Sequence, residues 1–311
     1  MENKKLRIAL GSDIHLEFGP ITLTNDENAD VLVLAGDICV AKHFVDGRPT
    51  YVQHLAKEYR QFFDNVTKEF PHVVYCLGNH EHYQGDIAKS YNILKEHLDY
   101  SNLHILEKEC WEHMGHTFIG GTLWTDMNKE DSLAMNYAQQ SMNDFREVLN
   151  SNRMVVRQVP VYEQNPLWTG DGKNGGYYNK DSTGANIMIG YKSKEEPARW
   201  TPEDSVADHK KMLDYIDIVT RNPGSYIVVG HHVPSELGVA DMYKGNLLNA
   251  AFRSDLDDFI EARPQIKLWM FGHTHFNFNF WIGDTHLLCN PRGYTGHESI
   301  ADWFKLQYIE V

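Results

Sequence analysis

The sequence has few cysteines and no long apolar run, and both shortages restrict what the protein can be. The four cysteines, Cys39, Cys76, Cys110 and Cys289, are far apart and form no C-x-x-C pair. Such scattered cysteines are typical of small buried residues in a reducing compartment. The N-terminal residues run directly into a predicted strand, without a signal peptide or a membrane-spanning segment. We therefore expect a cytoplasmic protein with no membrane association.

Positive charge is also scarce. Lys and Arg total 29 against 43 Asp and Glu, and the formal net charge is −14. Binding to a nucleic acid needs clustered Lys and Arg, so a nucleic acid is not the expected partner. A local basic pocket or a bound metal would still attract a phosphate. Histidine, by contrast, is abundant at 17 residues, which favours metal chemistry.

One sequence pattern occurs five times along the chain. Each copy is a short aliphatic or β-branched run, followed by Gly and then by Asp, Asn or His. Such continuous apolar runs predict strands that are buried on both faces of an α/β sheet. Polar groups just beyond the carboxyl ends of these strands are where open α/β sheets place their binding sites. The five copies are LRIALGSDIH (6–15), DVLVLAGDI (30–38), HVVYCLGNHEH (72–82), SYIVVGHHVP (225–234) and KLWMFGHTH (267–275).

Helical patterns separate these strands, and the C-terminal part is typical of strands and turns, with a hairpin at Gly283-Asp284. The alternation predicts a single α/β domain over residues 1–311. Residues 151–200 are different, because they are rich in Gly, Asn, Lys and Tyr and have little periodicity. We interpret them as an insertion or flap over the site, with a plain surface loop as the alternative. The predicted helices cover residues 50–70, 86–98, 130–150 and 201–220.

The strand tips carry a donor set that suits divalent metal ions. Residues i and i+2 of an extended chain point to the same side, as Asp13 with His15 and His273 with His275 would do. Carboxylates, imidazoles and an amide, without a thiolate, suit hard-to-borderline ions such as Mn²⁺, Fe²⁺ or Zn²⁺. There are more donors than one tetrahedral ion needs, and they suit two ions about 3.5–4 Å apart that share a carboxylate. The tips supply Asp13, His15, Asp37, Asn79, His80, His231, His232, His273 and His275.

The ordered motifs D-x-H, G-D, G-N-H-E, G-H-H and G-H-T-H resemble the calcineurin-like metallophosphoesterase superfamily from Asp13 to His275. The sequences NPRGY (290–294) and SMNDFREV (141–148) are similar to a branch that is common in bacteria and phages. The resemblance implies a fold of the α/β class, a four-layer α-β-β-α sandwich of two packed mixed sheets flanked by helices. It also implies a metal-dependent hydrolase of phosphate esters.

The resemblance further implies two divalent ions, with Asp37 as the carboxylate that bridges them. Manganese is the expected metal, with Fe, Zn, Ni or Mg as alternatives. Adjacent residues of an extended chain face opposite ways, so His231 and His232 cannot both point inward easily, and we favour His231. The implied ligands are Asp13, His15 and His275 for the first ion, and Asn79, His231 and His273 for the second.

Two further residues receive roles from their motifs. The resemblance implies that His80 is not a ligand but lies beside the substrate, as a general acid or as a donor to the phosphoryl oxygens. Arg292, in the turn-forming NPRGY, is a candidate contact for the substrate phosphate, and a structural salt bridge is the alternative. Glu81 and His82 are expected to support the ligands or to line the rim of the site.

The function implied is hydrolysis of a phosphate mono- or diester by a hydroxide that bridges the ions, with a small-molecule or nucleotide substrate. A nuclease is one alternative, which the acidic charge disfavours. A protein Ser/Thr phosphatase is another, but such enzymes usually begin with G-D-x-H-G, whereas Leu16 and Glu17 follow SDIH here. A catalytically silent scaffold is the third, and such proteins typically lose metal-binding histidines, none of which is missing.

Overall fold

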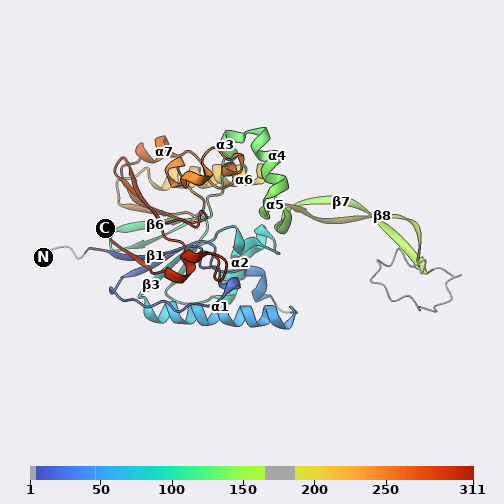
Figure 1. The fold of residues 1–311 in the computed structure, drawn as a ribbon, viewed down its shortest axis with the longest axis horizontal. Coiled ribbons are helices and arrows are strands. Elements are labelled where there is room, and N and C mark those ends of the chain that lie inside the picture. The colour runs from blue at the N-terminus through green and yellow to red at the C-terminus, as the bar shows by residue number, and fades with distance from the viewer. Residues whose placement is uncertain (1–4, 46, 165–185) are drawn as a thin grey trace. The chain divides into compact units, whose positions relative to one another are not determined.

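The computed structural model describes residues 5–45, 47–164 and 186–311. By their internal contacts the residues form two compact units. The larger unit comprises Met1–Leu149 together with Arg199–Val311, and the smaller one comprises Asn150–Ala198. In the larger unit two sheets lie face to face, and helices cover their outer faces (Figure 1).

The first sheet contains four parallel strands and one antiparallel edge strand. Its strand order is β13-β1-β2-β3-β4, and only β13 runs antiparallel to its neighbour, β1. Crossovers between parallel neighbours carry helices, as expected for a buried parallel sheet. The strands are β1 (Arg7–Gly11), β2 (Val31–Ala35), β3 (His72–Cys76), β4 (Leu103–Leu106) and β13 (Gln307–Glu310).

The second sheet has a parallel centre with an antiparallel strand at each edge. Its order is β11-β12-β10-β9-β6-β5, in which β6, β9, β10 and β12 are parallel. The turn at Gly283 joins β11 to β12, so the predicted hairpin is present. The strands are β5 (Glu109–His113), β6 (His116–Gly120), β9 (Tyr226–Val229), β10 (Ile266–Phe271), β11 (Phe278–Ile282) and β12 (Thr285–Cys289).

Successive side chains of a strand point to opposite faces of the sheet, so the apolar side chains of each sheet are divided between two cores. On β2, Val33 points to the core between the sheets, where its register neighbours Leu10 and Val74 also lie. Leu32 and Leu34 point the other way and pack beneath the helices of the first sheet. A third core separates the second sheet from its own helices. Because both faces of central strands such as β2 and β9 are covered, their runs are apolar throughout, as the sequence indicated.

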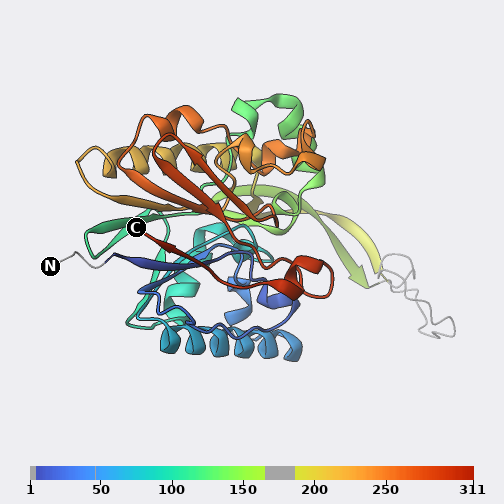
Figure 2. The same ribbon diagram turned by 60° about the vertical axis from the view of Figure 1, so that its left-hand side comes forward.

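Helices cover the outer face of each sheet. Figure 2 shows α1 (Thr50–Glu69) along one face and α6 (Pro202–Val219) along the other. The helix α2 (Ile87–His97) lies in the connection between β3 and β4, and the short α7 (Asp257–Glu261) contacts β11. A capping box formed by Thr201 and Asp204 starts α6. The predicted four-layer sandwich of two mixed sheets is confirmed.

The predicted helix over residues 130–150 is wrong in its extent. It is replaced by α3 (Met127–Glu130), α4 (Ser132–Ser141) and α5 (Asp144–Glu147). The backbone of Met142 is extended and ends α4, so that Phe145 and Val148 can join a small core around Trp124 and Trp200. Tertiary packing thus interrupts a sequence whose periodicity is helical.

In the smaller unit the structure describes two long strands, β7 (Leu149–Gln164) and β8 (Asn186–Arg199), which pair with each other. The sequence indicated no regular structure in this segment. Residues 165–185 lie outside the described residues, and the role of residues 151–200 as an insertion or flap stays a prediction. Among the described residues, every helix is too short or too polar to span a bilayer.

Three histidines surround one tryptophan on β3, β4 and β5. His72 Nδ1 and His104 Nε2 are 3.5 Å apart, and the ring of Trp111 stacks on His104 at 4.1 Å and on His113 at 5.1 Å. Burial, together with the proximity of His72 and His113, lowers the pKa of His104 to about 4. This cluster lies where β3 begins, at the opposite end of that strand from Asn79.

We predict that the cluster makes the fold sensitive to acid. An unfolded histidine titrates near pH 6.5, so between pH 6.5 and about 4 the unfolded chain binds a proton at position 104 that the folded chain does not. Stability is therefore complete above pH 6.5 and falls as the pH is lowered. His104→Gln should flatten the pH dependence of urea unfolding in that range by roughly one proton.

The matched control is His54→Gln, since that side chain is 70% exposed on α1. It should leave the slope unchanged. Equal slopes for the His104→Gln protein and the unmodified protein would contradict the prediction.

Candidate metal centre

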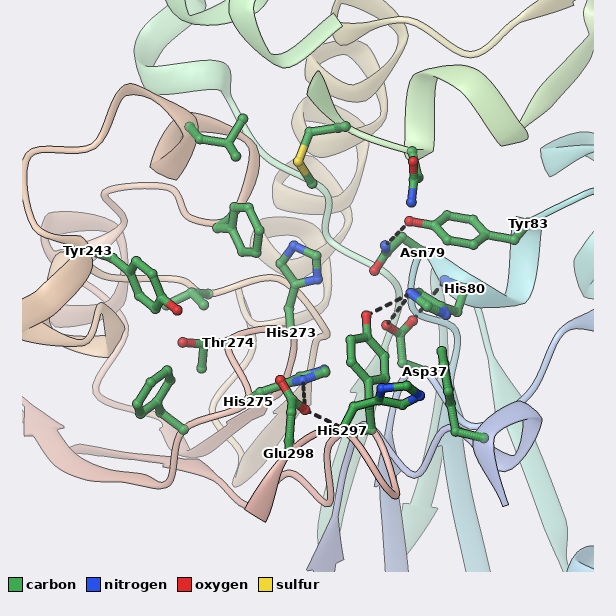
Figure 3. A pocket seen from close by; sticks show the side chains of 18 of the residues that line it. Asp37, Asn79, His80, Tyr83, Tyr243, His273, Thr274, His275, His297 and Glu298 are labelled. Carbon is green, nitrogen blue, oxygen red and sulfur yellow. Dashed lines mark hydrogen bonds and ion pairs between the residues drawn. The ribbon is translucent and has the colours of Figure 1, made fainter. Parts of the chain in front are cut away.

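The predicted donors gather at the carboxyl ends of strands from both sheets. Asp13 follows β1, Asp37 follows β2 and Asn79 follows β3, while His231 follows β9 and His273 follows β10. They lie at a pocket of about 1180 Å³, and Figure 3 shows Asp37, Asn79 and His273 on its lining. Parallel strands end at one edge of a sheet, and stacking two sheets in this way brings their polar tips together.

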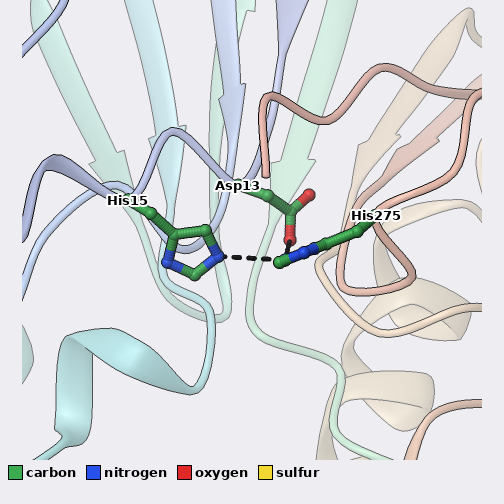
Figure 4. Close-up of side chains that lie close together, drawn as sticks. All are labelled: Asp13, His15 and His275. Atoms are coloured by element: carbon green, nitrogen blue, oxygen red, sulfur yellow. Dashed lines mark hydrogen bonds and ion pairs between the residues drawn. The ribbon is translucent and has the colours of Figure 1, made fainter. Parts of the chain in front are cut away.

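One cluster of donors consists of Asp13, His15 and His275, whose ligand atoms all lie within 4.8 Å of one another. His15 Nε2 lies 3.0 Å from His275 Nε2, and His275 Nε2 lies 3.5 Å from Asp13 Oδ1. Figure 4 shows the three side chains pointing at a common point. These are the three residues expected for the first ion.

A second cluster consists of Asp37, His231 and His273, again with ligand atoms within 4.8 Å. His231 Nε2 lies 3.3 Å from Asp37 Oδ2 and 3.1 Å from Asn79 Oδ1. The Asn79 amide donates to the hydroxyl of Tyr83 at 3.1 Å, which turns its oxygen toward His231. The donors expected for the second ion are therefore adjacent.

Asp37 lies between the two clusters. Its Oδ2 is 3.3 Å from His231 Nε2, 3.7 Å from His15 Nε2 and 3.9 Å from His80 Nε2. The side chain is almost fully buried. A buried carboxylate that several imidazole nitrogens face is the arrangement expected of a bridging ligand.

The residues fit divalent cations. His273 Nε2 is buried, and no hydrogen-bond partner for it exists among the described residues. His15 Nε2 and His275 Nε2 face each other at 3.0 Å, where an ion could accept both lone pairs. Oxygen and imidazole donors without a thiolate match borderline ions. Burial alone would lower the pKa of His231, yet Asp37 outweighs it and raises this pKa to about 10. The same negative field attracts a metal cation.

The donors project from an unusual backbone. Five of them have positive φ: Asp13 (49°), His15 (48°), Asp37 (56°), His273 (69°) and His275 (52°). Left-handed backbone is costly for residues with a Cβ and persists only where the surroundings impose it. Such strain is typical of functional sites. In a regular strand the side chains would instead alternate between the two cores.

The glycines of the motifs make room for the ligands. A Cβ at Gly272 would lie 2.5 Å from Asp13 Oδ2. A Cβ at Gly78 would lie 2.8 Å from His231 Nε2 and even closer to the Asp37 carboxylate. Such contacts are closer than real Cβ atoms allow, so each strand must end in a residue without a side chain.

In three of the histidines, the Nδ1 atom donates a hydrogen bond to an acceptor outside the donor clusters. This orients the ring so that Nε2 points toward the candidate metal centre. His231 Nδ1 donates to the carbonyl of Ala35 at 2.9 Å, and His275 Nδ1 donates to Glu298 Oε2 at 2.7 Å. His15 Nδ1 donates to Glu17 Oε1 at 3.0 Å. Acceptors of this kind usually fix the orientation of metal-binding imidazoles.

Glu81 ties the tips of β2 and β3 together. Its carboxylate accepts hydrogen bonds from the backbone nitrogens of Asp37 (3.1 Å), Ile38 (2.7 Å) and Gly78 (2.7 Å), and from the hydroxyl of Tyr75 (2.7 Å). Burial and the nearby Asp37 raise its pKa to about 7. This placement fits the supporting role expected from the sequence.

His80 lies beside Asp37 and forms, with Asp37 and His15, a third group of donors whose ligand atoms lie within 4.8 Å of one another, although its predicted role is not that of a ligand. Its Nδ1 contacts Glu17 Oε1 at 2.7 Å, its backbone nitrogen donates to Asp37 Oδ1 at 2.8 Å, and its ring stacks on Tyr83 at 4.2 Å. Its Nε2 lies 3.4 Å from the hydroxyl of Tyr294. Burial would lower the pKa of His80, but Asp37 and Glu17 raise it to about 9. A protonated imidazole facing a pocket can donate a proton.

The structure separates His231 from His232. Their rings are at 89° to each other, and His232 Nδ1 lies 3.3 Å from the carbonyl of Thr122, with its ring 5.0 Å from that of Trp124. Burial and the neighbouring His231 lower the pKa of His232 to about 3. Of the two, only His231 faces Asp37, although the ligand role itself stays a prediction.

Arg292 is buried beneath a neighbouring loop and is not on the pocket lining. Its guanidinium donates to the carbonyls of Ile14 (3.0 Å), Gly19 (2.7 Å) and Pro20 (3.1 Å). These bonds hold the loop that follows β1. The predicted contact with a substrate phosphate is not tested by this arrangement and stays a prediction.

Sequence reasoning missed three residues of the site. Glu17, Tyr294 and Glu298 contact His80, His15 or His275, but none of them ends a buried strand. The signal for Glu17 is its i, i+2 spacing from His15. Tyr294 and Glu298 lie in the loop after β12. Tyr294 ends the NPRGY motif, in which Arg292 alone was assigned a role, and no local pattern marks Glu298.

We predict that Glu81 is needed for both stability and metal affinity. Glu81→Ala removes the acceptor of four backbone N–H groups and should lower the free energy of unfolding by about 2–4 kcal/mol. Without these hydrogen bonds the backbone at Asp37 is no longer fixed, so the affinity of the site for manganese should also fall. Urea unfolding and equilibrium dialysis measure the two effects. Glu112→Ala, an exposed position on β5, is the control, and indistinguishable results for the two variants would refute the role of Glu81.

Comparison with known proteins agrees with this fold. Residues 6–277 match the family described as calcineurin-like phosphoesterase. An uncharacterized protein of Acanthamoeba polyphaga mimivirus is 24% identical over 316 residues, which cover 92% of this chain and 90% of the viral protein. The crystal structure of the phosphopantetheinyl hydrolase PptH from Mycobacterium tuberculosis is similar with a TM-score of 0.55. The two chains are 14% identical, and the match covers 99% of this chain and 96% of the PptH chain. At so low an identity the similarity concerns the fold alone.

Proposed function

Since this chain belongs to the calcineurin-like phosphoesterase family, whose members are metal-dependent, we propose that it hydrolyses a phosphate mono- or diester of a small molecule with two divalent cations. The observation that carries the proposal is the position of Asp37. This one buried carboxylate belongs to a donor group with His231 and His273 and to another with His15 and His80, and His15 is also a member of the group with Asp13 and His275. A single ion would leave one of these groups without a partner.

The proposed ligand sets follow the clusters. Asp13, His15 and His275 would hold one ion, and Asp37 would bridge to the other. Asn79, His231 and His273 would complete the second set. Manganese suits this mixture of oxygen and imidazole donors, and Fe, Zn, Ni or Mg are the alternatives.

Two bound cations would supply a water of lowered pKa and would neutralise charge on the phosphoryl oxygens. The chain's own residues do the rest. His80 carries its proton on the nitrogen that faces the pocket and would give it to the departing oxygen. Glu17 accepts from His80 Nδ1, which fixes the ring and favours the protonated form. The hydroxyl of Tyr294 limits the rotation of the same ring.

The alternatives receive less support. All eight side chains proposed to hold metals or to transfer the proton are present and lie close together, which favours an enzyme over a silent scaffold. No specific observation among the described residues favours a nuclease or a protein Ser/Thr phosphatase. Cys39, Cys76 and Cys289 are buried free thiols, in keeping with the proposed cytoplasmic location.

We predict hydrolysis of p-nitrophenyl phosphate by the purified protein in the presence of Mn²⁺. A chelator should abolish it, and added Mn²⁺ should restore it. Asp37→Asn should lose bound metal and activity together, because the bridging charge disappears; metal analysis on the assayed sample measures both. Asp241→Asn, whose side chain is 94% exposed, is the matched control. Full activity of the Asp37→Asn protein would contradict the proposal.

His80→Ala should slow turnover by roughly 10²- to 10⁴-fold while both ions remain bound, since general acid catalysis contributes about that much. Glu17→Gln should give a smaller loss, because the imidazole keeps a hydrogen-bond acceptor but loses the charge. Kinetics with metal analysis on each variant separates the roles. If His80→Ala strips both ions, His80 is a ligand and not the proton donor.

A further inference from the structure

The wall of the pocket carries carboxylates but lacks lysine and arginine among its described residues. Among its described lining residues there are the carboxylates of Glu17, Asp37, Glu147 and Glu298 but no Lys or Arg. The other lining residues are histidines, hydroxyl-bearing residues, neutral amides such as Asn143, or apolar or aromatic residues. Apart from histidines such as His80, positive charge on this lining would therefore come from the metal ions.

This distribution restricts the number of phosphates that a substrate can carry. Proteins bind additional phosphoryl groups with Arg or Lys, because each desolvated phosphate needs a cation or several donors. The cations at the strand tips serve one phosphoryl group. A second group elsewhere in this pocket would meet carboxylates such as Glu147 or Glu298 and would be repelled.

The surface next to His80 is aromatic. Phe18 is 40% exposed although it lines the pocket, and its ring lies 4.5 Å from that of Tyr294. Tyr294 in turn reaches His80 through its hydroxyl. A large apolar side chain left in contact with solvent beside a reactive centre is typical of a ligand contact. The departing oxygen would leave at His80, so the organic part attached to it would lie against this surface.

We propose that the substrate is an ester with a single phosphoryl group, and that its organic part is uncharged and packs an apolar or ring surface against Phe18 and Tyr294. This inference rests on the proposed function, because that function places the phosphoryl group at the metal clusters. The pocket volume of about 1180 Å³ accommodates an organic part much larger than a phenyl ring. Nucleic acids and substrates with several phosphates are excluded.

The first experiment tests the charge. Adenosine 5′-monophosphate and adenosine 3′,5′-bisphosphate share one organic part and differ by one phosphate. With the manganese-loaded protein, the bisphosphate should have a kcat/KM at least roughly tenfold lower, as one unpaired phosphate charge would cause. Equal values for the two compounds would overturn the proposal.

The second experiment tests the aromatic surface with phenyl phosphate and 2-naphthyl phosphate. The additional ring should raise kcat/KM by roughly five- to tenfold, from the apolar area that it buries. Phe18→Ala should abolish this preference with unchanged metal content, and Phe18→Leu should retain part of it. Retention of the full preference by Phe18→Ala would overturn the assignment.

Two variants are matched controls. Tyr243 is also on the pocket lining and is 44% exposed, but Figure 3 shows it on the other side of the pocket from His80. Tyr51 is 69% exposed on α1 and is not on the lining. Tyr243→Ala and Tyr51→Ala should both keep the naphthyl preference. Loss of the preference in Tyr243→Ala alone would place the organic part elsewhere and would overturn the proposal.

Binding of 2-naphthol, followed by its fluorescence, separates this inference from the proposed function, since binding requires no turnover. If no ester is hydrolysed but 2-naphthol binds and Phe18→Ala weakens it, the function fails and the neutral subsite is supported. If esters are hydrolysed without regard to charge or ring size and 2-naphthol does not bind, the function stands and the inference fails.

Discussion

The buried carboxylate of Asp37 is the constraint on which the rest of the site depends. A buried negative charge is costly unless cations or donors surround it. Here it is faced by imidazoles from both sheets, and it accepts the backbone N–H of His80. The negative charge of Asp37 favours cations at the nitrogens that face it, and it raises the pKa values of His80 and His231. Burial outweighs this effect at His15 and His273, whose pKa values are lowered.

The two sheets supply the rigidity that such an arrangement needs. The strands end in glycines, and the donors that follow adopt left-handed backbone that costs free energy at each position. Stable cores on both faces of each sheet offset that cost. Glu81 adds a local anchor, because it fixes the backbone on either side of the β2 and β3 tips. Left-handed backbone also occurs elsewhere, among other places at Leu123, Trp124 and residues 127–130, but at the strand tips it falls on the residues whose side chains must converge.

The pocket combines two kinds of surface with different tasks. The floor carries the proposed donors for metal ions, through which it would bind phosphate. The wall near His80 presents Phe18 and Tyr294, which would offer apolar contact to the organic part of a substrate. In the described residues no cationic side chain extends the phosphate-binding surface beyond the floor. On these grounds selectivity between esters would come from the organic part and not from recognition of several phosphates.

The sequence by itself predicted the buried strands, most of the helices and all the donors, because these follow from local rules. An apolar run followed by Gly and a polar residue predicts a buried strand with a polar tip wherever it occurs. Five such runs predicted a shared site at one edge of the sheets. Tertiary structure alone decided how the 130–150 helix is interrupted, which of His231 and His232 faces Asp37, and that Arg292 holds a backbone loop. It also placed Glu17, Tyr294 and Glu298 at the site; the ring of Tyr294 lies 4.6 Å from that of His15, although the two residues are far apart in sequence. Such choices depend on packing between distant segments, and no local pattern encodes them.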